Sequence, residues 1–147
     1  MWGLKPLIMP LRIIYRDNME LKGRAISKGV VEGIAIVSKK PFSFLGGVDE
    51  DGNIIDKDSD LYEESLKGKI FVFPYGKGST VGSYVIYGLA KRGILKGIVN
   101  KECEPIVATG AILGGIPLVD KVDIEKINTG DKIIVDGNKG VVKILNK

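Results

Sequence analysis

Short apolar runs separated by glycines dominate the hydrophobic pattern from Met19 onward. Apolar or alternating runs of about four to eight residues are typical of β-strands, and glycine, proline or Asp-Gly pairs mark the turns between them. An Asp-Gly-Asn-Lys sequence at residues 136–139 predicts a hairpin, and the acidic residues 49–53 predict a tight turn. The pattern predicts strands at residues 21–26, 33–38, 69–73, 98–99, 116–119, 132–135 and 140–144.

Two other segments have the features of helices. Apolar residues at the spacing of one helix face predict a helix that ends near Arg92 and buries the stripe Val81, Tyr84, Val85, Gly88 and Leu89. A second helix is predicted to begin at residues 104–105, because proline is well tolerated in a first turn, and to end at residues 114–115. Strands outnumber helices, so the pattern predicts one compact α/β domain.

The first 18 residues are a separate question. All the methionines, Met1, Met9 and Met19, fall at this end, and the apolar stretch between them is interrupted by prolines and an arginine. It is too interrupted for a signal-peptide core and too short for a membrane span. We interpret residues 1–18 as a leader or as the product of a start upstream of the real one, with residues 19–147 forming a single domain.

Composition excludes several classes of function. The chain has no histidine, so it holds no Ser-His-Asp triad, no histidine-ligated metal and no phosphohistidine. The single cysteine, Cys103, predicts a reducing, cytoplasmic setting and is interpreted as a structural thiol. The net charge of +4 is spread along the chain without a basic stripe, which argues against a nucleic-acid partner, and nothing indicates a membrane partner. The acidic run at residues 49–60 lacks the spacing of a calcium loop.

The loop at residues 75–82, Tyr-Gly-Lys-Gly-Ser-Thr-Val-Gly, is the best candidate for chemistry. Gly76 and Gly78 allow close approach of the backbone to a ligand, and Ser79 or Thr80 occupies the expected N-cap of the following helix. The free N–H groups at a helix N-terminus favour a carboxylate or phosphate. The spacing does not fit a Walker loop, and a capped helix without a ligand remains an alternative.

A second glycine loop spans residues 41–49 and contains Phe42, Phe44, Leu45, Gly46 and Gly47. Two aromatic residues and a leucine are unusual in an exposed connection, so a surface for a partner or ligand would explain them. The alternative is a loop that folds back on its own core.

Three motifs then carry a family resemblance: Ser-Phe-Leu-Gly-Gly-Val-Asp at 43–49, Gly-Lys-Gly-Ser-Thr-Val-Gly-Ser-Tyr at 76–84, and Gly-Asp-Lys-Ile-Ile-Val-Asp-Gly at 130–137. In order and spacing they resemble the aconitase X swivel-domain family, from about Leu21 to the C-terminus. The resemblance implies a swivelling β/β/α domain of the aconitase type. It also implies a heterodimer, in which the domain closes over a large catalytic subunit.

The resemblance further implies a hydro-lyase whose small subunit is active only with the large one. Ser79 would be the catalytic proton acceptor, and Lys77, Gly78, Thr80, Gly46 and Gly47 would bind substrate. No cofactor is expected on this chain, and an iron–sulfur cluster, expected as 4Fe–4S, would act as Lewis acid on the large subunit. Among archaeal members the implied reaction is dehydration of (R)-5-phosphomevalonate to trans-anhydromevalonate 5-phosphate, in the mevalonate pathway of isoprenoid biosynthesis.

Two alternatives stay open. Ordinary aconitases continue Ser-Arg-Glu after the serine, where this chain has Thr80, Val81 and Gly82. The missing arginine argues against a tricarboxylic acid, because bidentate carboxylate binding is typical of arginine. The same chemistry on another hydroxy acid, such as a hydroxyproline, is the first alternative, and a non-catalytic lid or regulatory subunit is the second. A phosphohistidine carrier, which has a similar swivelling fold, is excluded by the absence of histidine.

Overall fold

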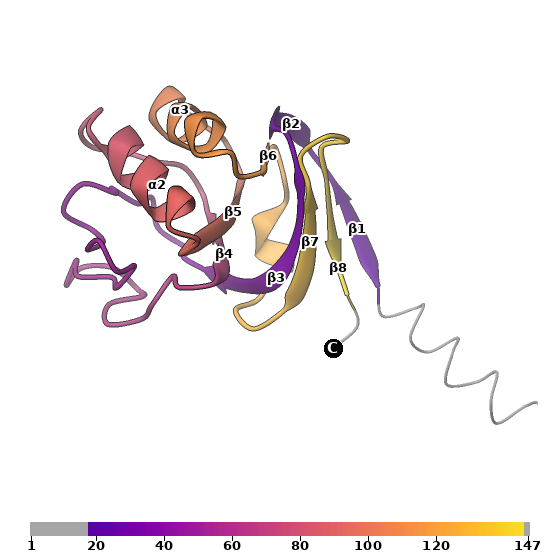
Figure 1. Ribbon diagram of the computed structural model, residues 1–147. Helices are drawn as coiled ribbons and strands as arrows, with labels where there is room; N and C mark the ends of the chain where they lie inside the picture. The colour runs from indigo at the N-terminus through magenta and orange to yellow at the C-terminus, as the bar shows by residue number, and fades with distance from the viewer. Residues whose placement is uncertain (1–17, 146–147) are drawn as a thin grey trace, which may run out of the picture.

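The computed structural model describes residues 18–145 and consists of one curved sheet and a layer of helices (Figure 1). The helices are α2 (Gly82–Lys91) and α3 (Pro105–Gly114), with a short 3₁₀ turn at Ile124–Lys126. The expectation for residues 1–18 falls almost wholly outside the described residues. The strands are β1 (Met19–Lys22), β2 (Arg24–Ser27), β3 (Val30–Val37), β4 (Lys69–Phe73), β5 (Leu95–Asn100), β6 (Leu118–Asp120), β7 (Lys132–Asp136) and β8 (Val141–Ile144).

The sheet closes on itself. Its strand order is β1-β8-β7-β3-β4-β5-β6-β2, so the consecutive strands β1 and β2 lie at its two ends. Only Gly23 separates them: its N–H donates to the carbonyl of Gly140 at 2.8 Å, and a Cβ there would overlap the carbonyl oxygen of Asp120. The predicted single strand at 21–26 is therefore divided, because its first half pairs with β8 and its second half with β6.

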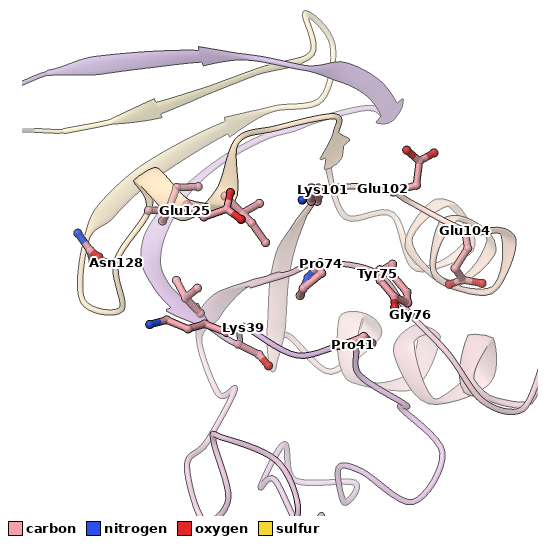
Figure 2. Close-up of a pocket in the computed structure, with 14 residues that line it drawn as sticks. Lys39, Pro41, Pro74, Tyr75, Gly76, Lys101, Glu102, Glu104, Glu125 and Asn128 are labelled. Carbon is pink, nitrogen blue, oxygen red and sulfur yellow. The ribbon is translucent and has the colours of Figure 1, made fainter.

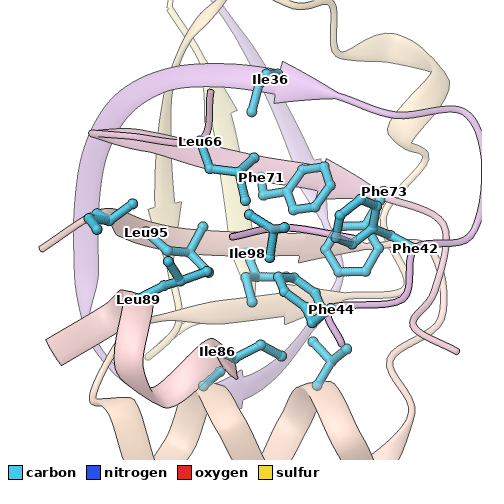
Figure 3. Packing of buried hydrophobic residues seen from close by; sticks show 14 of the residues in the cluster. Ile36, Phe42, Phe44, Leu66, Phe71, Phe73, Ile86, Leu89, Leu95 and Ile98 are labelled. Atoms are coloured by element: carbon cyan, nitrogen blue, oxygen red, sulfur yellow. The ribbon is translucent and has the colours of Figure 1, made fainter. Parts of the chain in front are cut away.

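Two separate cores give the β/β/α arrangement predicted from the resemblance. One core fills the inside of the curved sheet with small aliphatic side chains such as Ala35, Val72 and Val135. The other lies between strands β3–β6 and the helices and contains Phe71, Leu95 and Ile86 (Figure 3). Strands β4 and β5 contribute to both cores because their successive side chains point to opposite faces. The parallel strands β4, β5 and β6 are thus buried on both sides, as are Ala35 and Ile36 near the end of β3.

Phenylalanines anchor the loop after β3 to the helix-side core. Phe42 and Phe44 are each only 2% exposed and pack edge-to-face against each other, with ring centroids 5.0 Å apart. Phe42 also meets Phe71 edge-to-face at 5.0 Å (Figure 3). The loop therefore folds back on the core, so the partner-surface alternative is wrong for these two aromatic residues, and Leu45 alone of the three stays exposed.

Helix α2 buries a different face from the predicted one. Its buried residues are Gly82, Ile86 and Leu89, whereas Val81 and Tyr84 of the predicted stripe are exposed. The reason is the close approach of α3: a Cβ on Gly110 would lie 2.7 Å from Cβ of Ile86. Contact with α3 turns Ile86 inward, so Val81 and Tyr84 of the predicted stripe stay exposed, while Val85 is half-buried against the core and Leu89 is buried.

Other predictions hold with shifts of up to three residues, the largest at the starts of β3 and β5. Strand β4 and helix α3 have the predicted bounds, and β7 and β8 form the predicted hairpin. Strand β6 begins two residues after the predicted start, because residues 116–117 still belong to the connection from α3. The turn at residues 49–53 is present, with the Asp49 N–H donating to the Asn53 carbonyl at 2.9 Å. No helix within residues 18–145 has the length and hydrophobicity needed to cross a membrane.

Candidate functional site

The two glycine loops are hydrogen-bonded to each other. The Phe42 N–H donates to the carbonyl of Tyr75 at 3.1 Å, and the Lys77 N–H donates to the carbonyl of Phe42 at 3.1 Å. These bonds form a parallel bridge between Phe42 and Gly76, although the two loops are more than thirty residues apart in sequence. Because Phe42 is buried in the core, this bridge ties the loop that carries Ser79 to the rigid part of the domain.

Ser43 packs directly against the backbone of Gly78. The Ser43 hydroxyl donates to the carbonyl of Leu45 at 3.0 Å, which fixes its side chain. Gly78 has φ +89, and a Cβ at this residue would overlap Ser43 Oγ. Only glycine satisfies both the left-handed conformation and the close contact. Ser43 therefore holds the backbone immediately before Ser79.

Ser79 is exposed in the turn just before the N-terminus of α2. Its Oγ accepts a hydrogen bond from the Val81 N–H at 3.1 Å, and its carbonyl accepts from the Gly82 N–H at 3.0 Å. The N-cap of α2 is Val81, so the prediction of Ser79 or Thr80 as N-cap is wrong by one or two residues. A turn formed by residues 79–82 precedes the helix and moves its start, yet the serine hydroxyl still satisfies an N–H group at the positive end of α2.

The other predicted substrate contacts divide into exposed and buried residues. Lys77, Gly78 and Thr80 are exposed beside Ser79 on the same loop, and Gly46 is exposed on the neighbouring one. Gly47 is buried, and a Cβ there would overlap the carbonyl oxygen of Ser43. The structure therefore brings both loops together and gives Gly47 a part in the tight turn that follows Ser43.

A cavity of about 930 Å³ opens beside this site, where strands β3, β4 and β5 end (Figure 2). Carboxyl ends of parallel strands are a frequent location of ligand sites in α/β sheets. Tyr75 and Gly76 belong to both the cavity wall and the Ser79 loop. The remaining lining residues are Val37, Ser38, Lys39, Pro41, Pro74, Lys101, Glu102, Glu104, Ile124, Glu125, Ile127 and Asn128.

Glu104 supports the base of the loop from the opposite side. It is the N-cap of α3, and its two carboxylate oxygens accept from the N–H groups of Ile106 at 2.8 Å and Val107 at 2.9 Å. A Cβ on Gly76 would lie 2.5 Å from Glu104 Oε1. The carboxylate therefore caps the start of α3, whereas the first N–H groups of α2 are hydrogen-bonded to Ser79 and Thr80 of the preceding turn.

Asp120 holds the segment that leads into α3. It is fully buried and accepts from Arg24 Nε at 2.9 Å and from Arg24 Nη2 at 2.8 Å. Its Oδ2 also accepts the N–H of Cys103 at 2.9 Å. The bidentate ion pair thus joins β2, β6 and the residue before the α3 cap.

Cys103 does not fit a role as a cluster ligand. Burial, together with the nearby carboxylates of Asp120 and Glu104, raises the pKa of the thiol to about 12. A metal ligand must be a thiolate, and an iron–sulfur cluster takes several of them. Within residues 18–145 no group of three or more cysteine or acidic side chains is arranged to hold a metal ion.

The sequence did not indicate that Ser43, Glu104 and Asp120 support the candidate site. Ser43 lies inside a recognised motif, but its contact with Gly78 depends on the bridge between distant loops. The predicted start of α3 already contained Glu104, although only the fold brings its carboxylate to Gly76. No local signal connects Asp120 with Arg24, which are 96 residues apart.

Comparison with known sequences finds one family and several close relatives. The sequence profile of the aconitase X swivel domain matches residues 20–144. The protein named phosphomevalonate dehydratase small subunit from Methanocaldococcus jannaschii is 90% identical, over 88% of this chain and 100% of that protein. The protein of the same name from Pyrococcus abyssi is 57% identical, over 86% of this chain and 99% of that protein.

A solved structure supports the same similarity. The crystal structure of Thermococcus kodakaraensis aconitase X in its holo-form superposes with a TM-score of 0.84 at 55% sequence identity. The match covers 87% of this chain and 99% of that chain. The similarity in sequence and in fold thus extends over nearly all of the described residues.

Proposed function

The chain belongs to the aconitase X swivel-domain family, and on that premise we propose that it is the small subunit of a two-chain hydro-lyase. The enzyme dehydrates (R)-5-phosphomevalonate to trans-anhydromevalonate 5-phosphate, a step of archaeal isoprenoid synthesis. Relatives named phosphomevalonate dehydratase small subunit, at 90% to 52% identity, support both the reaction and the division into small and large subunits. The enzyme works in the cytoplasm.

Ser79 acts as the proton acceptor in this proposal. A neutral serine is a weak base, so the site has to stabilise the alkoxide form. The observation that carries the assignment is the hydrogen bond from the Val81 N–H to Ser79 Oγ at 3.1 Å, at the positive end of α2. A backbone N–H and a helix N-terminus aimed at an oxygen both favour negative charge there. The exposed Lys77 adds a positive charge on the same loop.

The large subunit supplies the rest of the active site. The described residues hold no set of metal ligands, and Cys103 stays a protonated thiol. An iron–sulfur cluster on the large subunit supplies the Lewis acid for the leaving hydroxyl. This chain contributes the base and a wall of the substrate site.

Exposed backbone and side chains of the two loops bind the substrate. Lys77, Gly78, Thr80 and Gly46 lie at the surface around Ser79 and contact the phosphorylated hydroxy acid. Gly47 contributes through the turn that positions Gly46. No arginine follows Ser79, which favours a substrate with one carboxylate over a tricarboxylic acid.

The test is dehydratase activity of the anaerobically assembled complex, with wild-type small subunit and with Ser79→Ala. Ser65→Ala is a matched control, because Ser65 Oγ accepts from the Lys67 N–H at 3.1 Å in a similar turn away from the site. We expect Ser79→Ala to lower kcat by about two to four orders of magnitude and Ser65→Ala to leave it unchanged. Binding of each variant to the large subunit is measured in parallel.

Two results would contradict parts of the proposal. Full activity of the Ser79→Ala complex would make this chain a non-catalytic lid and place the base on the large subunit. A well-formed wild-type complex with an intact cluster that leaves phosphomevalonate unchanged would contradict the substrate, and hydroxyprolines would be the next substrates to assay.

A further inference from the structure

The outer face of the helix layer is almost free of charged side chains. Helix α3 has 10 residues and no charged side chain, and the only charge on the 10 residues of α2 is Lys91 at its end. A helix on the surface of a soluble protein normally has a polar side. Yet Tyr84 is 74% exposed and Leu113 is 59% exposed. The isolated chain therefore exposes a face with almost no charged side chains, and such a face is suited to contact with a partner.

A groove of about 450 Å³ runs between the two helices on this face. Its lining contains only hydroxyl-bearing and apolar residues: Thr80, Ser83, Tyr84, Tyr87, Thr109 and Leu113. Tyr84 also borders a second groove of about 340 Å³ on the other side of α2, whose lining includes the charged residues Asp49, Glu50 and Arg92. Tyrosine is enriched among the residues that contribute most to binding in protein interfaces.

The groove is continuous with the candidate catalytic loop. Thr80, which follows Ser79 directly, forms one end of its lining. The proposed function requires Ser79 to reach an active site on the large subunit, so that subunit must come close to Thr80. A second copy of this chain seated on the same face would lie against the residue next to Ser79 and would compete with the large subunit.

We propose that this helix-layer face, defined by Thr80, Tyr84, Tyr87 and Leu113, is the docking surface for the large subunit. The proposal rests on the proposed function and adds the surface by which the two chains associate. The complementary surface on the large subunit has few charges and combines apolar side chains with hydrogen-bond partners for the hydroxyl groups that line the groove. Docking there holds the start of α2, and with it Ser79, over the partner's active site.

Single lysine substitutions test the surface without disturbing the core. Leu113→Lys and Tyr84→Lys place a charge in the uncharged groove, and Val30→Lys is the matched control because Val30 is an aliphatic residue on β3 with 58% exposure. Titration of the purified large subunit with each variant gives the dissociation constant. We expect it to rise at least about tenfold for Leu113→Lys and Tyr84→Lys, and to stay within about twofold for Val30→Lys. Thermal unfolding of each isolated chain checks that the variants remain folded.

Three outcomes would overturn the docking surface. In the first, Leu113→Lys and Tyr84→Lys are folded and bind the large subunit like wild type, and the complex dehydrates phosphomevalonate. The proposed function then stands, and the assignment of the docking surface is wrong. In the second, the isolated wild-type chain dimerises, the lysine variants are monomeric and binding to the large subunit is unchanged, so the face pairs with a second copy. In the third, wild type does not bind the large subunit at all, and the proposed function fails together with the surface.

Discussion

The hydroxyl of Ser43 lies against the α-carbon of Gly78, one residue before the candidate catalytic serine. A Cβ on Gly78 would overlap Ser43 Oγ, and the hydroxyl cannot turn away freely because it is hydrogen-bonded to the Leu45 carbonyl at 3.0 Å. Together with the bridge between Phe42 and Gly76, this contact makes two distant loops a single unit. The position of Ser79 thus depends on the phenylalanine core beneath Phe42 and Phe44.

Gly78→Ala should disturb both the fold and the site. It forces a left-handed φ of +89 on an alanine and pushes its Cβ into Ser43 Oγ. We expect the free energy of unfolding to fall by about 2 kcal/mol and kcat of the complex to fall by more than tenfold. Chemical denaturation and steady-state kinetics measure the two effects.

The double variant Ser43→Gly/Gly78→Ala separates the two causes. Removing the Ser43 side chain relieves the overlap but leaves the unfavourable φ, so part of the lost stability should return. If the double variant loses as much stability as the two single variants together, or more, the contact between Ser43 and Gly78 is not the source of the strain.

Glu104→Ala should destabilise α3 and loosen the base of the Ser79 loop. The substitution leaves the N–H groups of Ile106 and Val107 without their acceptors, which costs about 1–2 kcal/mol for an N-cap. Glu104→Gln keeps one carbonyl acceptor and should lose about half as much. Urea unfolding at pH 7 measures both variants. Equal stability of wild type and Glu104→Ala would mean that water replaces the cap.

Local signals explain which parts of the fold were predictable. Strand β4 is a short apolar run that stops at Pro74, and helix α3 begins at a Glu-Pro pair and ends before Gly115, so their bounds could be predicted without knowledge of the rest. The closure of the sheet could not be predicted from such local signals. It depends on one extended segment changing partners at Gly23, where the backbone meets β6 and the turn before β8.

Tertiary contacts also decided what pattern reasoning left open. The predicted stripe on α2 included Tyr84, which is exposed, and omitted Ile86, which the approach of Gly110 turns into the core. Both glycine loops stood out in the sequence as separate candidates. Their hydrogen bonds to each other, and the role of Ser43, follow from the parallel pairing of β3 and β4 and were not available from residue spacing.

Asp120→Ala should lower stability more than a surface substitution does. Asp120 is completely buried, and its removal leaves the Cys103 N–H without an acceptor and frees the Arg24 guanidinium. We expect a loss of about 2 kcal/mol in the free energy of unfolding, because the Cys103 N–H loses its acceptor, while the half-exposed Arg24 side chain can turn to water. Glu102→Ala, which removes an exposed ion pair with Lys121 one residue before Cys103, is the control and should change stability by less than about 1 kcal/mol. Comparable losses for the two variants would contradict the structural role of Asp120.

Cys103 should make the stability of the domain fall at alkaline pH. Burial raises the pKa of its thiol from 9.0 to about 12 in the folded chain, with Asp120 and Glu104 adding to the shift. Below pH 9 the thiol is protonated in both states and has no effect on the pH dependence. Between about pH 9 and pH 12 the unfolded chain releases this proton while the folded chain keeps it, so the free energy of unfolding decreases as pH rises.

Comparison with Cys103→Ala isolates that contribution. Both chains share all lysines and tyrosines. The change in unfolding free energy from pH 7.5 to pH 10 therefore differs between the two chains only by the contribution of the thiol. We expect wild type to lose more stability than Cys103→Ala over this interval, and iodoacetamide to modify native wild type far more slowly than the urea-unfolded chain. Two results would contradict this prediction: parallel pH profiles for the two proteins, or rapid alkylation of the native thiol at pH 7.5. Either would show that Cys103 titrates like an exposed cysteine and that the buried environment formed by Asp120 and Glu104 does not persist in solution.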